Sequence, residues 1–439
     1  MAPDKTKTAH VSGGDTEGGI TSSYATQDGV QLKVPYSFFG SIYDNREFDA
    51  AVAAMKQDSL TMGPKTTEFQ NKFARAHGVK HALACSNCTV SMHVATQLFN
   101  IREGDEVIVT PTTFIATSLV ILKEKARPVY ADIDPRTFNI DPDAVRKKIT
   151  KKTKAIYVVH YGGLMCDMDP IMDTARKHGL LVMEDCAHTT GAEYKGRRAG
   201  SIGDAGCFSF HSLKNITTCG EGGMITTGRD DFAKGIEMLR CMNLIPYDPK
   251  QTRWEWGSLS IEKKQDNDYW IPAHFNIDDW NGHWGNNYRM NEIQAAVGCA
   301  QLDKLDMLNE KRRTIGRKIT EGIRDLKGIT PLWEPGPEYK HVYHLYTLCV
   351  EEKELGASRD EFLRVLYNQE GIQGILHYQP TYHFTGLQKL GYARNLCPNA
   401  EQFFYKRELN IPMHPRLTEE SIQDMVQGIR NAWEKVRKK

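Results

Sequence analysis

The 439-residue chain lacks any long apolar run, and this absence argues against a membrane-spanning helix. A helix needs about 20 consecutive apolar residues to cross a bilayer, and no stretch of the sequence approaches that length. Excess charge is lacking too, because 56 Lys and Arg residues balance 55 Asp and Glu residues, for a net charge of +1. The sequence therefore gives no electrostatic reason to expect nucleic acid or a membrane surface as a partner.

The chain has ten cysteines, a modest number for its length, and no disulfide framework. Several copies lie inside apolar runs, as free thiols of a reducing compartment do, namely Cys207, Cys219, Cys299 and Cys349. Cys85 and Cys88 have the spacing of a redox or zinc pair, but no second such pair accompanies them. We therefore expect a cytoplasmic protein without a metal centre.

The N-terminus lacks the apolar stretch of a signal peptide. Residues 1–33 are mostly polar and rich in Thr, Gly, Ser and Asp, which predicts a flexible tail. A second unusual segment, residues 244–286, is polar and aromatic, and it holds five of the seven tryptophans: Trp254, Trp256, Trp270, Trp280 and Trp284. A packed excursion or subunit contact and a role in the substrate site are both open for this segment.

Short apolar runs alternate with helix-period segments over the first two thirds of the chain. The runs are hydrophobic throughout, as strands buried on both faces are: residues 106–109, 128–131, 155–159 and 180–183. Helical stretches such as 141–149 and 169–178 lie between them. This alternation predicts an α/β fold with a mostly parallel sheet in a large domain over residues 34–301. A smaller α+β domain is expected over residues 302–439.

A lysine and an acid suggest one particular cofactor. Lys214 stands just before the glycine-rich stretch 220–223, and Asp185 follows the apolar run 180–183. Pyridoxal 5′-phosphate (PLP) requires a lysine for its covalent attachment and an acid to hold the proton on its ring nitrogen. Either residue alone is weak evidence, but the pair predicts a PLP site. Lys214 needs a lowered pKa to move protons, and a cationic ring beside it would supply the cause.

Further residues suit the phosphate and the ring of this cofactor. Residues 84–92 run from a strand into a helix, whose free N–H groups make an anion site around Thr89 and Val90. Ser209 is placed to add a hydroxyl donor to the phosphate.

Phe114 and His188 suit the cofactor ring. Phe114 follows a predicted strand and either stacks on the ring or belongs to the core. His188 either donates to the phenolate oxygen of the ring or is structural.

The chain resembles the DegT/DnrJ/EryC1/StrS sugar aminotransferases over most of its length. Matching segments follow in the family's order: residues 60–64, 184–188, 209–215, 287–292, 341–346 and 409–415. The resemblance implies the architecture of fold-type-I PLP-dependent aminotransferases and a homodimer whose active sites are shared between subunits. The sequence departs from the family at Cys88, where glycine is usual, and in the longer 244–286 segment.

The resemblance also assigns roles to single residues. Lys214 matches the lysine that binds PLP, Asp185 its pyridinium partner, His188 the residue near the phenolate oxygen and Phe114 the stacking aromatic. Thr89, Val90 and Ser209 match the phosphate binders, and Asn287 matches the asparagine that reaches the phosphate in the neighbouring subunit. Arg289 is a candidate for binding an acidic group, and His344 and His377 fall in segments close to the substrate.

These expectations combine into one hypothesis about function. The protein moves an amino group from glutamate or glutamine to a nucleotide-linked keto sugar, and PLP alternates with its pyridoxamine form in a ping-pong sequence. A dehydratase branch of the family has histidine in place of Lys214, so the lysine favours transamination. Two alternatives stay open: an elimination, cyclisation or dehydration on the same scaffold, and a non-catalytic regulator that senses a ligand.

Overall fold

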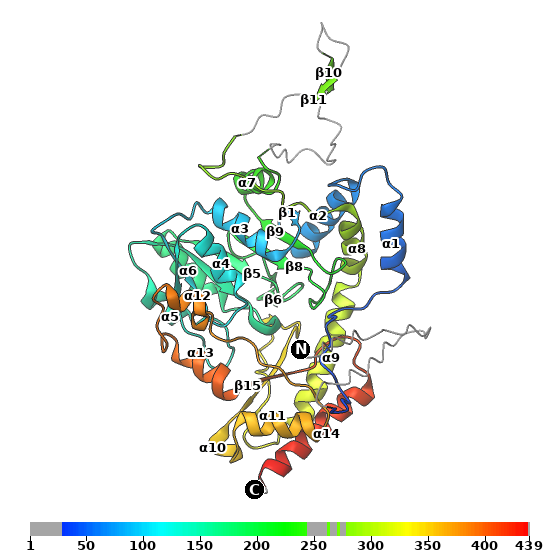
Figure 1. Ribbon diagram of the computed structural model, residues 1–439, viewed down its shortest axis with the longest axis vertical. Helices are drawn as coiled ribbons and strands as arrows, with labels where there is room; N and C mark the ends of the chain where they lie inside the picture. Colours follow the sequence, from blue (N-terminus) through cyan, green and yellow to red (C-terminus); the bar gives the residue numbers. More distant parts are fainter. Residues whose placement is uncertain (1–28, 244–260, 264–269, 273–277, 438–439) are drawn as a thin grey trace, which may run out of the picture.

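The computed structural model describes residues 29–243, 261–263, 270–272 and 278–437. A large sheet and its helices form one part of the molecule, and the C-terminal strands and helices lie below it (Figure 1). Residues 1–28 of the predicted tail and most of the tryptophan-rich segment lie outside the described residues. No helix in the described part of the chain has the length and apolar character that crossing a bilayer requires.

The large sheet is mixed and mostly parallel, as predicted. Its strand order is β1-β9-β8-β5-β4-β2-β3. The strands are β1 (His81–Cys85), β2 (Glu106–Val109), β3 (Arg127–Tyr130), β4 (Thr153–Val159), β5 (Leu181–Asp185), β8 (Ala205–Ser209) and β9 (Gly223–Thr227). Only β9 runs against its two neighbours, β1 and β8. The carboxyl ends of β2, β4, β5 and β8 therefore meet at one rim.

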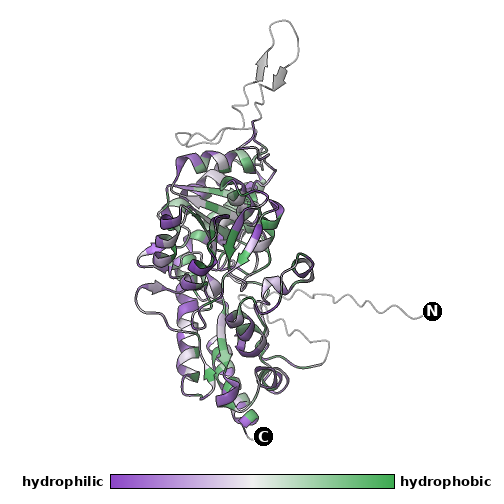
Figure 2. Cartoon of the chain, turned by 90° about the vertical axis from the view of Figure 1, so that its left-hand side faces the viewer, coloured by the Kyte–Doolittle hydropathy of each residue, from purple (hydrophilic) through white to green (hydrophobic). Residues whose placement is uncertain are grey.

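Helices cover both faces of this sheet, which explains why its strands are apolar throughout. The helices on its faces are α2 (Pro64–His77), α3 (Cys88–Leu98), α4 (Ala116–Lys123), α5 (Pro142–Lys148), α6 (Met168–His178), α7 (Asp230–Arg240) and α8 (Glu292–Asp303). Helix α1 (Asn45–Met55) packs against α8. Val107 packs into the core with α3, α4 and α7, whereas Ile108 packs into a second core with α2, α5, α6 and α8. Figure 2 shows this distribution as apolar strands inside and polar outer helix surfaces.

Local signals in the sequence set several of the helix ends. Asp141 caps α5 by accepting the N–H of Asp143 at 2.9 Å, and Pro142 fills the first helical position. Gly179 ends α6 with a φ of 65°, a left-handed conformation that glycine adopts without strain. The strand and helix positions expected here from the sequence agree with the structure to within two residues.

The C-terminal region is built on a three-stranded antiparallel sheet of order β12-β14-β15. Its elements are α9 (Leu305–Ile323), β12 (Ile329–Thr330), β14 (Tyr346–Val350), α10 (Glu352–Leu355), α11 (Arg359–Asn368), α12 (Thr385–Lys389), α13 (Pro398–Gln402), β15 (Glu408–Ile411) and α14 (Glu419–Arg437). The start of the described chain joins this region, because Lys33 and Val34 both donate their N–H groups to Gly371 O.

Two small sheets complete the described elements. One combines β6 (Glu193–Tyr194), β7 (Arg197–Arg198) and β13 (Tyr339–Lys340), and it thereby ties the large sheet's connections to the C-terminal part of the chain. The other pairs β10 (Ile261–Lys263) with β11 (Trp270–Pro272) inside the tryptophan-rich segment.

Candidate active site

Asp185 is the last residue of β5 and lies buried at the rim of the large sheet. Thr117 Oγ1 donates to its Oδ2 at 2.8 Å, and the N–H of Ala187 donates to its Oδ1 at 3.1 Å. Burial raises the pKa of Asp185, while these two donors and the charge of Lys214 oppose the rise. A cation placed against this carboxyl would favour its charged form.

Lys214 lies in the turn that follows β8, close enough to Asp185 for the two charges to influence each other. Burial lowers the pKa of Lys214, and nearby acidic groups, Asp185 first among them, oppose this effect. In the described part of the chain, the Lys214 amine has no ion pair within 4 Å, and it lines a cavity. The Lys214 amine and the Asp185 carboxyl therefore influence each other's pKa without forming an ion pair.

The backbone of Lys214 is held against a glycine near the start of the described chain. Gly40 donates its N–H to Ser212 O at 2.7 Å. A Cβ atom at Gly40 would overlap the backbone oxygens of Leu213 and Lys214. Only a residue without a side chain permits this approach, so Gly40 fixes the turn that carries the lysine.

His188 is buried beside Lys214, and its hydrogen bonds define its tautomer. The N–H of Gly162 donates to Nδ1 at 3.3 Å, so the ring proton of a neutral imidazole resides on Nε2. Nε2 lies 3.3 Å from the Tyr378 hydroxyl, and the ring stacks on His344 at 4.2 Å between centroids. Burial first, and Lys214 second, hold the pKa of His188 well below its usual range. His188 is therefore a neutral Nε2–H donor.

The start of helix α3 reaches this site as well. Cys88, its first residue, lies close enough to Asp185 and Lys214 for both charges to act on its thiol, whose pKa burial raises well above the usual value. The N–H of Val90 is already donated to the capping Asn87 Oδ1 at 3.0 Å. The donors without an intrahelical acceptor are therefore the N–H groups of Cys88 and Thr89. Of the two predicted phosphate binders, Thr89 keeps an open N–H, while the Val90 N–H is occupied by the cap.

The remaining predicted residues fall into two groups. Ser209 ends β8 and is buried at the same rim as Asp185. Phe114 is 61% exposed just after β2, which excludes the alternative that it is a core residue. Asn287 and Arg289 lie instead on an exposed segment, where Arg289 Nε donates to Asn287 Oδ1 at 2.9 Å. These two side chains do not line the cavity beside Lys214.

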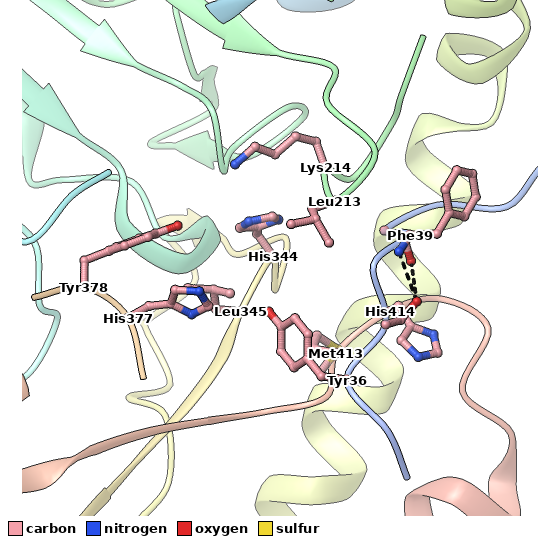
Figure 3. A pocket seen from close by; sticks show the side chains of 12 residues that line it. Tyr36, Phe39, Leu213, Lys214, His344, Leu345, His377, Tyr378, Met413 and His414 are labelled. Atoms are coloured by element: carbon pink, nitrogen blue, oxygen red, sulfur yellow. Dashed lines mark hydrogen bonds between the residues drawn. The ribbon is translucent and has the colours of Figure 1, made fainter. Parts of the chain in front are cut away.

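That cavity, about 50 Å³ in volume, combines segments from distant parts of the sequence. Figure 3 shows Lys214 and His344 toward one end and Tyr36, Met413 and His414 toward the other. It is lined by Tyr36, Ser37, Phe39, Gly40, Leu213, Lys214, His344, Leu345, His377, Tyr378, Met413 and His414. The sequence suggested His344 and His377 as close to the substrate, and both line the cavity. It missed Tyr36, Tyr378 and His414, and no local pattern marked them.

His160, Glu184 and Cys186 form a buried group with the spacing of a metal site in the described part of the chain. The donor atoms, however, are already in use. Glu184 accepts four hydrogen bonds, one of them from His160 Nε2 at 3.0 Å. His160 Nδ1 accepts the N–H of Cys166 at 3.1 Å. The group therefore acts as a hydrogen-bond network that supports the end of β5.

Comparison with known proteins agrees with this architecture. Residues 41–430 match the DegT/DnrJ/EryC1/StrS aminotransferase family. GDP-perosamine synthase of Caulobacter vibrioides is 35% identical over 403 residues, which cover 88% of this chain and 95% of that protein. PseC of Helicobacter pylori, an aminotransferase involved in the biosynthesis of pseudoaminic acid, is 27% identical, with a TM-score of 0.79 over 91% of this chain and 99% of that one.

A further solved structure was obtained with the cofactor bound. The putative sugar aminotransferase Spr1654 of Streptococcus pneumoniae, in its PLP form, is 25% identical, with a TM-score of 0.78 over 92% of this chain and 99% of that one.

The mixed sheet and its match to solved aminotransferases place the chain in the PLP-dependent fold-type-I class of aminotransferases. The chain belongs to the DegT/DnrJ/EryC1/StrS aminotransferase family.

Proposed function

We propose that the protein is a PLP-dependent aminotransferase that transfers an amino group from glutamate or glutamine to a nucleotide-linked keto sugar. The observation that carries the proposal is the buried pair of Lys214 and Asp185, which influence each other's charge without forming an ion pair. A lysine beside an aspartate normally forms a salt bridge. Because these two groups form no ion pair here, both are available to a cofactor bound at the rim.

The residues at the rim include the functional groups that binding of PLP requires. Lys214 is the amine that would hold the aldehyde, and Asp185 would face the ring nitrogen. The open N–H of Thr89 and the hydroxyl of Ser209 would hold the phosphate, while exposed Phe114 would lie against the ring. When bound, PLP supplies an electron sink that stabilises negative charge on the α-carbon of the donor.

Side chains of the protein would supply proton transfer, orientation and exclusion of water. Lys214, whose pKa is lowered by burial, takes the proton from the donor α-carbon at its Nζ. Neutral His188 offers its Nε2–H to an oxygen of the cofactor ring, in place of the Tyr378 hydroxyl that it faces. His344 stacks on His188 and so fixes the plane of the His188 imidazole. Tyr36 and Tyr378 narrow the cavity and reduce access of water to Lys214.

A sugar acceptor is supported by the relatives. GDP-perosamine synthase and PseC are 35% and 27% identical to this chain, respectively. The first name refers to a GDP-linked amino sugar, and the second protein is an aminotransferase involved in the biosynthesis of pseudoaminic acid. We infer that the acceptor of this protein is a keto sugar of the same chemical class.

We also propose a homodimer in the cytoplasm. Helix α1 leaves Phe48, Val52 and Met55 exposed at 56%, 45% and 54%, and their spacing places them on one stripe. A second copy would cover this stripe, and the family resemblance implies that Asn287 reaches the phosphate in the neighbouring subunit. All ten cysteines are free, which supports a reducing compartment.

Absorption spectroscopy of the purified enzyme with its cofactor tests the proposal. Glutamate or glutamine should remove the long-wavelength absorption band of enzyme-bound PLP. A nucleotide-linked keto sugar should then restore this band, and mass spectrometry should detect the amino sugar that forms. Borohydride trapping should label Lys214, and a Lys214→Ala variant should show neither reaction. If the band persists with every amino donor, an elimination, cyclisation or dehydration replaces aminotransfer. A protein purified without PLP would favour the regulator alternative.

A further inference from the structure

A largely buried chain of hydrogen bonds joins helix α3, the end of helix α4 and the segment that carries Asn287. His93 lies on α3 and is only 8% exposed. Its Nδ1 lies 3.0 Å from the Tyr288 hydroxyl, and its Nε2 lies 2.9 Å from Glu124 Oε1. Both ring nitrogens of His93 are therefore engaged, so the group is a hydrogen-bond chain and not a set of free metal ligands.

The protonation of these groups fixes the direction of the chain. Burial acts to raise the pKa of Glu124, but the hydrogen bond and charge of His93 outweigh it, so this pKa lies below its usual value. Burial raises the pKa of Tyr288, and the charge of Glu124 adds to the effect, so the phenol keeps its proton at neutral pH. A carboxylate only accepts hydrogen bonds, so a neutral imidazole at position 93 carries its proton on Nε2 and accepts the Tyr288 O–H at Nδ1. The carboxylate thus orients the imidazole, and the imidazole holds the phenol.

Tyr288 is held at its backbone as well as at its hydroxyl. Its N–H donates to Arg240 O at 2.9 Å, and its carbonyl accepts the N–H of Ser86 at 2.8 Å. Asn287 and Arg289 each form an antiparallel bridge, so the segment is extended and its successive side chains point to opposite sides. The hydrogen bond from Arg289 Nε to Asn287 Oδ1 places these two side chains together on the side away from His93. The inward-facing Tyr288 therefore determines where the outward-facing pair stands.

Helix α3 also carries the proposed phosphate donor of its own subunit. Thr89 lies about one helical turn before His93. Glu124 makes a second contact with the segment that leads to Asn287, because its Oε2 lies 3.6 Å from His283 Nδ1. One helix thus supports both the proposed phosphate site and the segment that the family resemblance assigns to the neighbouring phosphate.

We propose that His93 is a positioning residue for the cofactor phosphate, and that it acts through Tyr288 to place Asn287 at the phosphate of the neighbouring subunit. Hydrogen bonds are directional, so a fully paired chain of them restricts the segment more narrowly than apolar packing does. This inference rests on the proposed function, in particular on the sites shared between the subunits of the proposed homodimer.

Equilibrium titration of the full-length protein, freed of cofactor, compares PLP with pyridoxal, which lacks the phosphate. Tyr288→Phe keeps the aromatic ring, whose centroid lies 5.9 Å from that of His93, and removes only the hydroxyl. Tyr288→Phe and His93→Ala should each weaken PLP binding about tenfold, because each breaks the chain at one hydrogen bond. Pyridoxal binding should change less than about twofold. A loss of affinity for PLP that is no larger than the loss for pyridoxal would overturn the inference.

The C-terminal region offers a matched control with the same three groups. The Tyr405 hydroxyl lies 2.8 Å from His383 Nδ1, and His383 Nε2 lies 3.3 Å from Glu401 Oε1. None of these three residues lines the cavity beside Lys214. Tyr405→Phe should leave the ratio of the PLP and pyridoxal affinities unchanged. If it lowers this ratio as much as Tyr288→Phe does, the effect is general damage and the inference fails.

A double-mutant cycle identifies the residue through which His93 acts. In an Asn287→Ala background, His93→Ala should weaken PLP binding by less than about a further twofold, because the group that it places is already gone. A further tenfold loss would refute transmission through Asn287. If His93→Ala does not fold, Tyr288→Phe takes its place in the cycle.

Mixed dimers test whether the effect passes between subunits. An unaltered subunit paired with a Lys214→Ala, His93→Ala subunit leaves one site with its lysine, and the Asn287 that faces this site comes from the altered subunit. This site should bind PLP about tenfold more weakly than the same site beside a subunit that carries Lys214→Ala alone. Equal affinities would confine the role of His93 to its own subunit and overturn the inference as stated.

The outcome separates this inference from the proposed function, since cofactor binding is measured without an acceptor. A selective loss of PLP affinity in a protein that aminates no keto sugar would preserve the role of His93 and refute the proposed acceptor. Amination of a keto sugar by a protein whose His93→Ala variant binds PLP with unchanged affinity would do the reverse.

Discussion

Replacing Glu184 with glutamine is expected to destabilise the protein by about 4 kcal/mol. The carboxylate is fully buried, and each of its oxygens accepts two hydrogen bonds. Oε1 accepts the N–H groups of Ile202 at 2.8 Å and Gly203 at 2.6 Å. Oε2 accepts the Nε2–H of His160 and the N–H of Gly200, both at 3.0 Å. A glutamine amide has one oxygen, so its NH₂ group must face two of these donors in either orientation.

The magnitude follows from the donors that lose their acceptor. Each buried donor left unsatisfied costs about 1–3 kcal/mol, so two cost about 2–6 kcal/mol. Burial raises the pKa of Glu184, but His160 and the backbone donors outweigh it, so the pKa lies below its usual value. The stabilisation is therefore fully present above the unfolded pKa of about 4.3 and is lost as the pH falls through the folded pKa. Neutral pH is the right condition for the measurement.

Urea unfolding at neutral pH measures the loss. Glu103→Gln is a suitable control, because Glu103 is exposed and its ion pair with Lys125 spans 3.4 Å at the surface. Such a pair contributes less than about 1 kcal/mol. A loss below about 1 kcal/mol in Glu184→Gln would refute the reasoning, because it would mean that the two displaced donors find other acceptors.

Two further outcomes follow from packing and burial. Gly40→Ala should lower the free energy of unfolding by about 1–3 kcal/mol and disturb Lys214, because the added Cβ overlaps the backbone of the turn that carries Lys214. Gly336→Ala is the control, because its Cβ meets nothing within 4 Å. Equal losses of stability in the two variants would contradict the argument. Burial lowers the pKa of His77 and of His341 to about 3. The unfolded chain, with histidine pKa values of about 6.5, then binds more protons between pH 6.5 and 3. Stability should therefore rise with pH across this window, and a Tm that is constant from pH 7 to pH 4.5 would contradict this.

The sequence by itself determined several elements of the large domain and the two residues with the clearest chemistry. The apolar runs of the large sheet are continuous because helices cover both of its faces, so the strand positions are visible in the composition alone. Asp185 and Lys214 could be paired from the sequence because PLP requires one acid and one lysine. The structure places both near the carboxyl ends of β5 and β8, neighbouring parallel strands that end at the same rim. Capping residues such as Asp141 act within one helical turn, so α5 was also visible from the sequence.

Only the tertiary structure decided the shape and charge of the cavity. Tyr36, Tyr378 and His414 are all far from Lys214 in the sequence, and packing of separate segments brings them together. The hydrogen bond from the Val90 N–H to Asn87 depends on the rotamer of the Asn87 side chain. The exposure of Phe114 depends on which other segments pack over it. Sequence patterns record local periodicity, whereas charge compensation depends on atoms that folding brings within a few ångströms.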